Sequence, residues 1–453
     1  MTSKQRLVLL IAIMASSVAF LDGSVINVAL PDISDELGGG LVTQQWVVDA
    51  YLITLGALML LAGSFSDLFG RKKILWTGLV GFGVTSVLCA IAPTSELLIV
   101  SRALQGVAGA LLVPSSLALI IAAFRGAAQG KAIGSWTAWT GISFVIGPLV
   151  GGFLVDAASW RLIFAINVVL IAGTLWLLSR LELDERRDTS IKLDVVGAVL
   201  CSVGLGGVSY ALIEQSHLGW HNPLIYLTLI GGIISLVGFV WHEARTAQPM
   251  LPLSLFKIRN FSVGNLATVS IYAALSISTF MVIIFIQQVG HYSAVQAGLS
   301  FLPVTIIMFL LSPRFGALAG KYGPRFFMAA GPVVAALGFL TFLNIDPAVS
   351  YWTHVFPGVI IFGLGLSMTV APLTAAILGV VGEKQAGIGS AINNAVARIA
   401  GLLGVAMIGI VTGSTLDFDG FKRGIVAMVA LLLIGGIISM IGISNTALVR
   451  EES

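Results

Sequence analysis

Charge is scarce in this chain of 453 residues. Only 10% of its residues are charged, whereas 57% are hydrophobic. A soluble domain is about a quarter charged, because charges must cover a surface that faces water. The composition therefore predicts a polytopic membrane protein. No basic stripe with interleaved aromatic residues is present, so we expect no nucleic-acid partner.

Cysteine and nucleotide-binding patterns are also nearly absent. Cys89 and Cys201 both lie in apolar runs, which favours small core residues over a disulfide or a metal pair. The five histidines show no metal-ligand spacing, and no G-x-x-x-x-G-K-[ST] loop occurs. We therefore expect no metal, no ATP site and no cofactor. The first apolar run, Leu7 to Leu30, is too long for a signal-peptide core and is expected to be an uncleaved first span.

Apolar runs of about 20 residues, the length that crosses about 30 Å of hydrocarbon, recur along the whole chain. They predict fourteen spans, at residues 7–30, 44–66, 74–92, 95–120, 131–154, 160–180, 194–215, 223–243, 261–286, 296–317, 325–344, 352–378, 386–411 and 424–445. Most of the 24 Lys and Arg residues fall in alternate loops. By the positive-inside rule, both termini are predicted to be cytosolic in a cell membrane.

A weak internal repeat divides the chain. "GSFSDLFGRKK" from Gly63 and "GALAGKYGPRF" from Gly316 both follow a second span and precede a third. The repeat predicts an all-α membrane protein with two six-helix bundles that are parallel repeats, plus an inserted helix pair. The expected parts are residues 1–190, 191–245 and 246–453, and we expect a monomer.

Three ionisable residues are expected at one depth in the first bundle. Asp22 lies about 12 Å from the outer end of its span at helical rise, and Asp49 and Arg102 enter their spans from the same side. An intramembrane charge costs several kcal/mol and normally faces a cavity or a partner. A dehydrated carboxylate beside a guanidinium can bind and release a proton or attract a cation. A purely structural Asp22–Arg102 pair is the alternative.

A short cytosolic loop is predicted at "GSFSDLFGRKKIL". Gly63 begins this stretch and Gly70 supplies its turn, while Asp67, Arg71 and Lys72 can pair with facing helix ends. We expect a latch that holds the two bundles together and breaks on opening. Ordinary positive-inside charge is the alternative for the basic residues.

The fifth span carries "GISFVIGPLVGG". Gly147 and Gly151 share one helix face and allow another helix to approach closely, while Pro148 permits a bend. Such a span suits a moving interface, although small-residue packing alone would look the same.

Several polar and aromatic residues within the spans are candidates for a substrate cavity. Arg398 is the one full charge deep in the second bundle, and Asn393 and Asn394 lie one turn away. Aromatic rings can stack on a lipophilic cation. The aromatic candidates are Tyr51, Trp136, Trp139, Phe144 and Tyr272.

These motifs together resemble the fourteen-span drug:proton antiporters of the major facilitator superfamily. "LDGSVINVALP" resembles their first-span motif, in which Asp22 is followed by Asn27. "LIVSRALQGVAGA" resembles the fourth-span motif, with Gln105 beside Arg102. "GPLVGG" resembles the fifth-span antiporter motif. The resemblance implies roles in coupling or binding for Asp22 and Arg102. It implies control of leak or conformational change by the fifth-span residues Gly141, Gly147, Pro148, Gly151 and Gly152.

The expected function is proton-coupled export of amphipathic, cationic, drug-like compounds by alternating access. Its expected partners are the exported molecule, protons and membrane lipid. An exporter of lipids or metabolites and a proton-coupled nutrient symporter remain alternatives. An intramembrane enzyme would need paired catalytic groups, which Asp22 and Asp49 match only loosely, so we do not expect an enzyme.

Overall fold

The computed structural model describes the chain except residues 183–192, 346–348, 382–384, 414–415 and 446–453. It also leaves the side chains at 67, 127, 130, 144, 145, 386 and 387 undescribed. The described residues form helices without strands, and fourteen of the segments are long and apolar enough to cross a membrane. Helices suit this setting because they satisfy their own backbone hydrogen bonds away from water. The predicted all-α class and the fourteen spans are confirmed.

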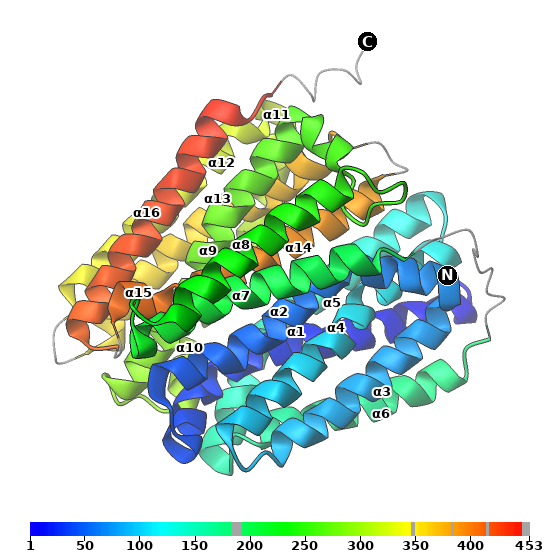
Figure 1. Cartoon of the computed structure of the whole chain (residues 1–453). Helices are drawn as coiled ribbons and strands as arrows, with labels where there is room; N and C mark the ends of the chain where they lie inside the picture. Colours follow the sequence, from blue (N-terminus) through cyan, green and yellow to red (C-terminus); the bar gives the residue numbers. More distant parts are fainter. Residues whose placement is uncertain (183–192, 346–348, 382–384, 414–415, 446–453) are drawn as a thin grey trace. The chain divides into compact units, whose positions relative to one another are not determined.

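The α-helices of the first half and the inserted pair are α1 (Ser3–Leu37), α2 (Gly40–Phe69), α3 (Arg71–Ala90), α4 (Ser95–Ala123), α5 (Gly126–Ala157), α6 (Leu162–Ser179), α7 (Val195–Leu218) and α8 (Pro223–Glu243). The second half contains α9 (Arg259–Gln288), α10 (Ala294–Ser300), α11 (Leu302–Tyr322), α12 (Pro324–Leu340), α13 (Phe356–Leu378), α14 (Ala386–Ala406), α15 (Ile408–Thr412) and α16 (Phe418–Gly442). Two short 3₁₀ helices, η1 (Leu253–Lys257) and η2 (Thr341–Asn344), and one short π-helix, η3 (Tyr351–Val355), lie between α-helices. Figure 1 labels the α-helices.

Two compact units divide the chain. The first comprises Met1–Val208, Leu227–Met250 and Ser293–Val295, and the second comprises Ser209–Tyr226, Leu251–Tyr292 and Gln296–Ser453. The inserted pair α7 and α8 is therefore shared between the two units. The expected three-part division by sequence stays a prediction.

The two units repeat one pattern of helix packing. In the first, α1 packs on α4, α5 and α6, α4 packs on α2 and α3, and α3 packs on α6. In the second, α9 packs on α13, α14 and α16, α13 packs on α11 and α12, and α12 packs on α16. Each of these six helix contacts of the first unit thus has its counterpart in the second, as the sequence repeat predicts.

Single glycines separate the second and third spans of both units. Gly70, with φ of 99°, ends α2, and Arg71 already begins α3. Gly323, with φ of 88°, divides α11 from α12 in the same way. Only glycine enters this backbone region without strain. The predicted loop from Gly63 to Leu75 is thus mostly helical, because both helices continue past the apolar segment and only Gly70 interrupts them.

Candidate functional site

Asp22 on α1 and Arg102 on α4 form a buried ion pair in the first unit. The Arg102 Nη1 atom lies 2.6 Å from Asp22 Oδ2, and each residue is 1% exposed. Arg102 also donates from Nε to the Val47 carbonyl at 3.0 Å and from Nη1 to Gln105 Oε1 at 2.6 Å. A buried guanidinium is costly unless such acceptors surround it. The predicted proximity of Asp22 and Arg102 is therefore present in the structure.

The Asp22 carboxylate accepts two further hydrogen bonds. Gln105 Nε2 donates to Asp22 Oδ1 at 3.1 Å, and Asn167 Nδ2 on α6 donates to the same oxygen at 2.8 Å. Gln105 Nε2 also donates to Ser86 Oγ on α3 at 2.9 Å. We call these residues the Asp22 network: Asp22, Ser86, Arg102, Gln105 and Asn167. It connects α1, α3, α4 and α6, and Arg102 extends it to the backbone of α2.

Asn167 and Ser86 were not among the predicted site residues. Uncharged polar residues are common in membrane helices, and no motif marks the sixth span. The available signal was composition: Asn167 is the one amide in α6, which is otherwise strongly apolar, with a mean hydropathy of 2.3. A fully buried amide in such a helix needs a polar partner, and Asp22 is that partner.

Two aromatic rings pack against the guanidinium of Arg102. Its Cζ atom lies 4.3 Å from the centroid of the Tyr51 ring and 5.8 Å from that of Phe164. Both rings are buried, and a cation over a ring face is stabilised by about 0.5–2 kcal/mol. Tyr51, which was predicted to stack on a substrate, is engaged by a cation of the protein itself in this state.

Asp49 on α2 lies outside the Asp22 network. Its side chain is fully buried, and neither carboxylate oxygen has a hydrogen-bond partner among the described residues. The structure therefore joins Asp22 and Arg102, and leaves the third expected member of the cluster isolated. An ionised carboxylate without partners is among the most expensive groups to bury. Asp49 is thus a buried acid for which the structure offers no stabilising partner among the described residues.

The glycines of the fifth span lie against α1 of the same unit. A Cβ on Gly147 would contact Ser24 and lie 3.2 Å from the Leu21 carbonyl, and one on Gly151 would contact Val25. The backbones of α1 and α5 can approach closely because these positions lack a side chain. A Cβ on Gly152 would meet Ala294, which belongs to the same unit, whereas Gly141 has open space. Pro148 lies inside α5.

Hydrogen bonds join α5 and α1 beside these glycines. Trp136 Nε1 donates to Ser16 Oγ at 3.0 Å, and Ser143 Oγ donates to Ser17 Oγ at 2.8 Å. Trp139, by contrast, is 54% exposed. The side chain of Phe144 lies outside the described residues. Among the predicted aromatic candidates of this span, Trp136 thus has a packing role in this state.

Asn27 follows Asp22 by five residues on α1. Its side chain is 9% exposed, and Nδ2 donates to the Ser24 carbonyl of its own helix at 3.5 Å. It does not join the Asp22 network. The first-span motif thus contributes one member of the network and one local hydrogen bond.

The predicted latch region is described only in part. Lys72 donates from Nζ to the Leu181 carbonyl at 2.5 Å, which ties the start of α3 to the chain after α6 within one unit. Gly63 has open space around it, and Arg71 is half-buried. The Asp67 side chain lies outside the described residues, so the latch stays a prediction.

Polar residues of the second unit gather around α9 and α14. Asn393 Nδ2 donates to Asn265 Oδ1 at 3.2 Å and to Thr268 Oγ1 at 3.0 Å. Asn394 is exposed and donates to the Ser390 carbonyl of its own helix. Arg398 lies close enough to Tyr272 for its charge to act on that hydroxyl. These residues form a polar surface on α9 and α14 that carries one cation, Arg398.

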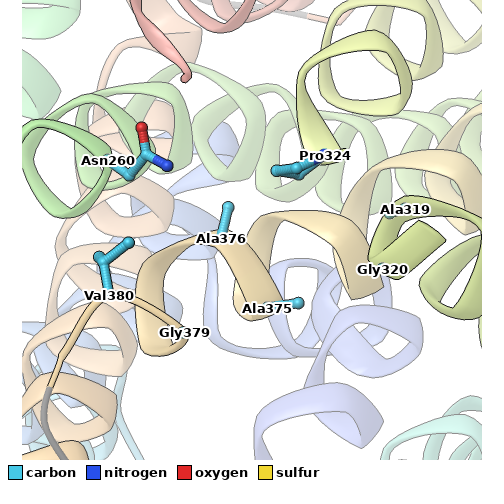
Figure 2. A pocket seen from close by; sticks show the side chains of 8 residues that line it. All are labelled: Asn260, Ala319, Gly320, Pro324, Ala375, Ala376, Gly379 and Val380. Atoms are coloured by element: carbon cyan, nitrogen blue, oxygen red, sulfur yellow. The ribbon is translucent and has the colours of Figure 1, made fainter. Parts of the chain in front are cut away.

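A small pocket opens at one end of the second unit (Figure 2). Its walls come from α9, α11, α12 and α13, and Asn260 is its one polar side chain. The Asn260 amide is already engaged, because it donates to the Ser444 carbonyl and accepts from the Ser444 N–H, both at 2.8 Å. The remaining lining is small and apolar, so the pocket offers no group that could bind a charged ligand.

Comparison with known proteins identifies the family. The sequence model of the Major Facilitator Superfamily matches residues 12–405. The chain belongs to the major facilitator superfamily. It is 32% identical to the methylenomycin A resistance protein of Bacillus subtilis, over 89% of this chain and 87% of that protein. It is 33% identical to the puromycin resistance protein pur8 of Streptomyces alboniger, over 90% of this chain and 82% of that protein. The multidrug resistance protein Stp of Mycobacterium tuberculosis is 31% identical to it, over 92% of this chain and 78% of that protein.

Solved structures of other transporters share the fold. A peptide transporter POT in complex with sulfate superposes with a TM-score of 0.71 at 14% identity, over 97% of this chain and 98% of that one. A bacterial homologue of the human lysosomal transporter Spinster, in an inward-facing and unoccupied conformation, superposes with a TM-score of 0.69 at 13% identity. The match covers 100% of this chain and 99% of that one. Because the chain belongs to this transporter superfamily and has fourteen helices of membrane-spanning length among its described residues, it is a multi-pass transporter of the cell membrane and not an enzyme.

Proposed function

We propose that this transporter exports amphipathic, drug-like compounds, cations foremost, in exchange for protons. The resistance proteins among its relatives support the drug-like class of substrate. The buried acids of the first unit support a cationic substrate and a proton as the counter-ion. The observation that carries the proposal is Asp49, which is fully buried and has no hydrogen-bond partner among the described residues.

Asp49 binds the transported proton in this scheme. A neutral carboxyl group tolerates an apolar site far better than an anion does. When the surroundings of Asp49 open to water, the carboxyl can lose its proton, and the resulting anion attracts a cationic compound. Re-protonation on the outer side removes that attraction and releases the compound. Coupling is therefore competition between a proton and a cation for one carboxylate.

Asp22 contributes to coupling in a different way. Its carboxylate holds Arg102, Gln105 and Asn167 at once. Each hydrogen bond to a charged group is worth about 1.5–3 kcal/mol, so the network must rearrange before Asp22 can exchange a proton. We assign the first proton to Asp49, and to Asp22 the task of keeping Arg102 in place until the network opens.

Proteoliposomes with an imposed pH gradient test the proposal. Lipophilic cations, zwitterions and neutral compounds are offered in turn, and substrate flux and internal pH are recorded together. We expect cation flux to follow the pH gradient and to carry protons in the opposite direction. Flux that follows only the gradient of the compound would overturn proton coupling. Proton and compound moving in the same direction would indicate a symporter.

A pair of matched variants tests the assignment to Asp49. Asp49→Asn replaces the acid with a neutral isostere, so we expect exchange of one compound for another to persist while pH-driven accumulation is lost. Asp35→Asn makes the same chemical change at an exposed position near the end of α1 and should leave both activities unchanged. Undiminished pH-driven accumulation in Asp49→Asn would move the proton site elsewhere.

A further inference from the structure

The inserted helices α7 and α8 bring three titratable side chains together at their paired ends. The two helices pack closely where Gly204, Gly207 and Gly232 leave room, and Ser235 Oγ donates to the Leu200 carbonyl at 2.8 Å. This packing places the start of α7 beside the end of α8. All of these residues belong to the first unit.

Asp194 caps the start of α7. Its Oδ1 atom accepts the Gly197 N–H at 2.8 Å, the arrangement of an N-terminal helix cap. The same oxygen lies 2.7 Å from His242 Nε2 in the last turn of α8. Because a carboxylate can only accept, the Nε2–H of His242 is the donor. Thr246 Oγ1 lies 3.1 Å from the same nitrogen. Asp194 therefore joins the start of α7 to the end of α8.

Glu243 adds a second carboxyl group to this junction. It is 3% exposed and Asp194 is 8% exposed, and the two carboxyl groups interact directly. A Cβ placed on Gly197 would lie 2.7 Å from an oxygen of each, so both face the same small space. Asp194 Oδ2 receives no donor from an amide, hydroxyl or imidazole of the described residues. A carboxyl group beside it can donate only if it carries a proton.

Few other charges of the described residues act on this junction. From α7, Cys201 is within electrostatic reach of Glu243. Beyond α8, the Arg245 guanidinium stacks on the Trp241 ring at 4.3 Å. His242 is the titratable neighbour on α8 itself. The basic residues Arg186, Arg187 and Lys192 precede α7 in the sequence and lie outside the described residues. Among the described groups, His242 and Glu243 are those that act on Asp194.

We propose that Asp194 and Glu243, with His242 beside them, form a proton-binding site that joins the ends of α7 and α8. Two contacting carboxyl groups that are shielded from water cannot both be ionised, so one proton is held between them. This site lies outside the six-helix bundle that contains Asp22 and Asp49. It is independent of the coupling scheme above.

The ionised member of the pair is Asp194. Burial raises the pKa of its carboxyl group, but hydrogen bonds from the Gly197 amide, His242 and Glu243 outweigh burial and hold that pKa below its ordinary value. Because Asp194 Oδ1 already accepts from the Gly197 amide and from His242, we assign the proton to Glu243. Loss of this proton would leave two adjacent anions and drive the ends of α7 and α8 apart. The positive-inside rule predicts that this end faces the cytosol, so the junction would respond to cytosolic pH.

Infrared spectroscopy of the purified full-length protein at neutral pH tests the proposal. We expect a carbonyl absorption of a protonated carboxyl group that shifts on ¹³C labelling of glutamate. Glu243→Gln, a neutral isostere that can still donate to Asp194, should remove this absorption. Glu182→Gln, which alters an exposed glutamate after α6, should retain it. On raising the pH, loss of the absorption in the wild-type protein should coincide with a fall in its melting temperature.

Two results would overturn the proposal. One is the absence of a glutamate-derived protonated carboxyl absorption at neutral pH in the wild-type protein, which requires no variant to fold. The other is a glutamate-derived absorption of a protonated carboxyl group that survives in Glu243→Gln. Neither result bears on proton-coupled export, because the coupling test depends on aspartate Asp49 and this one on a glutamate.

Discussion

Removing Arg102 should destabilise the first unit through the charge that it leaves behind. In Arg102→Leu, Asp22 keeps the amides of Gln105 and Asn167 but loses its counter-ion at a site that is 1% exposed. Breaking one partner of a buried ion pair costs about 3–5 kcal/mol, mostly because the other charge stays buried. Asp22→Asn leaves the Arg102 guanidinium buried without its counter-ion in the same way. We expect each single variant to lose stability in this range.

The double variant distinguishes this explanation from a simple loss of packing. Arg102→Leu with Asp22→Asn removes both charges, so it should cost no more than either single change, which corresponds to a coupling energy of about 3–5 kcal/mol. The assay is unfolding in a titrated denaturing detergent, followed by tryptophan fluorescence. Glu36 and Arg161 provide the control pair, because their side chains are 49% and 30% exposed at a separation of 2.6 Å. Their coupling should be about 0–1 kcal/mol.

Strict additivity at Asp22 and Arg102 would refute the reasoning. It would mean that the two side chains contribute independently, through volume and hydrogen bonds to third groups, and that the buried charges are screened. A coupling for the exposed control pair as large as that of the buried pair would refute it equally, since burial would then not decide the magnitude.

Three further outcomes follow from the structure. Asn167→Leu removes a donor from the buried carboxylate and should cost about 1–3 kcal/mol in the same unfolding assay, while Asn394→Leu, at an exposed position, should cost far less. Gly106→Ala would push a Cβ into Thr54 and the backbone of Tyr51, so the yield of folded protein should fall, whereas Gly134→Ala meets open space and should be neutral. Asp194 has a lowered pKa, so its contribution to stability is present above its ordinary pKa and is lost as the pH falls through the lowered value. Asp194→Asn should therefore flatten the acid side of the melting profile.

The sequence predicts the spans because each is a continuous apolar run of membrane length. It does not predict where helices end, because a helix can continue past the apolar segment into polar residues. The stretch from Asp67 to Lys73 illustrates this limit: its charges suggest a loop, yet α2 and α3 extend through it up to Gly70 on either side. The left-handed backbone of Gly70 is visible only in three dimensions.

The same distinction holds for the candidate site. Asp22 and Arg102 stand out because an intramembrane charge demands a partner, and their pairing is found in the structure. Depth along a helix could not separate Asp49 from them, because residues at one level can point in different directions. Asn167 carried no charge and no motif, although it binds the central carboxylate.

The Asp22 network has a mechanical consequence. Polar atoms from α1, α2, α3, α4 and α6 all bond, directly or through Gln105, to one guanidinium and one carboxylate. Moving any one of these helices along the others would break at least one of these bonds. A distance between α2 and α6, measured with spectroscopic probes, should therefore stay constant until the network opens, and movement before that step should occur in helices that the network does not hold.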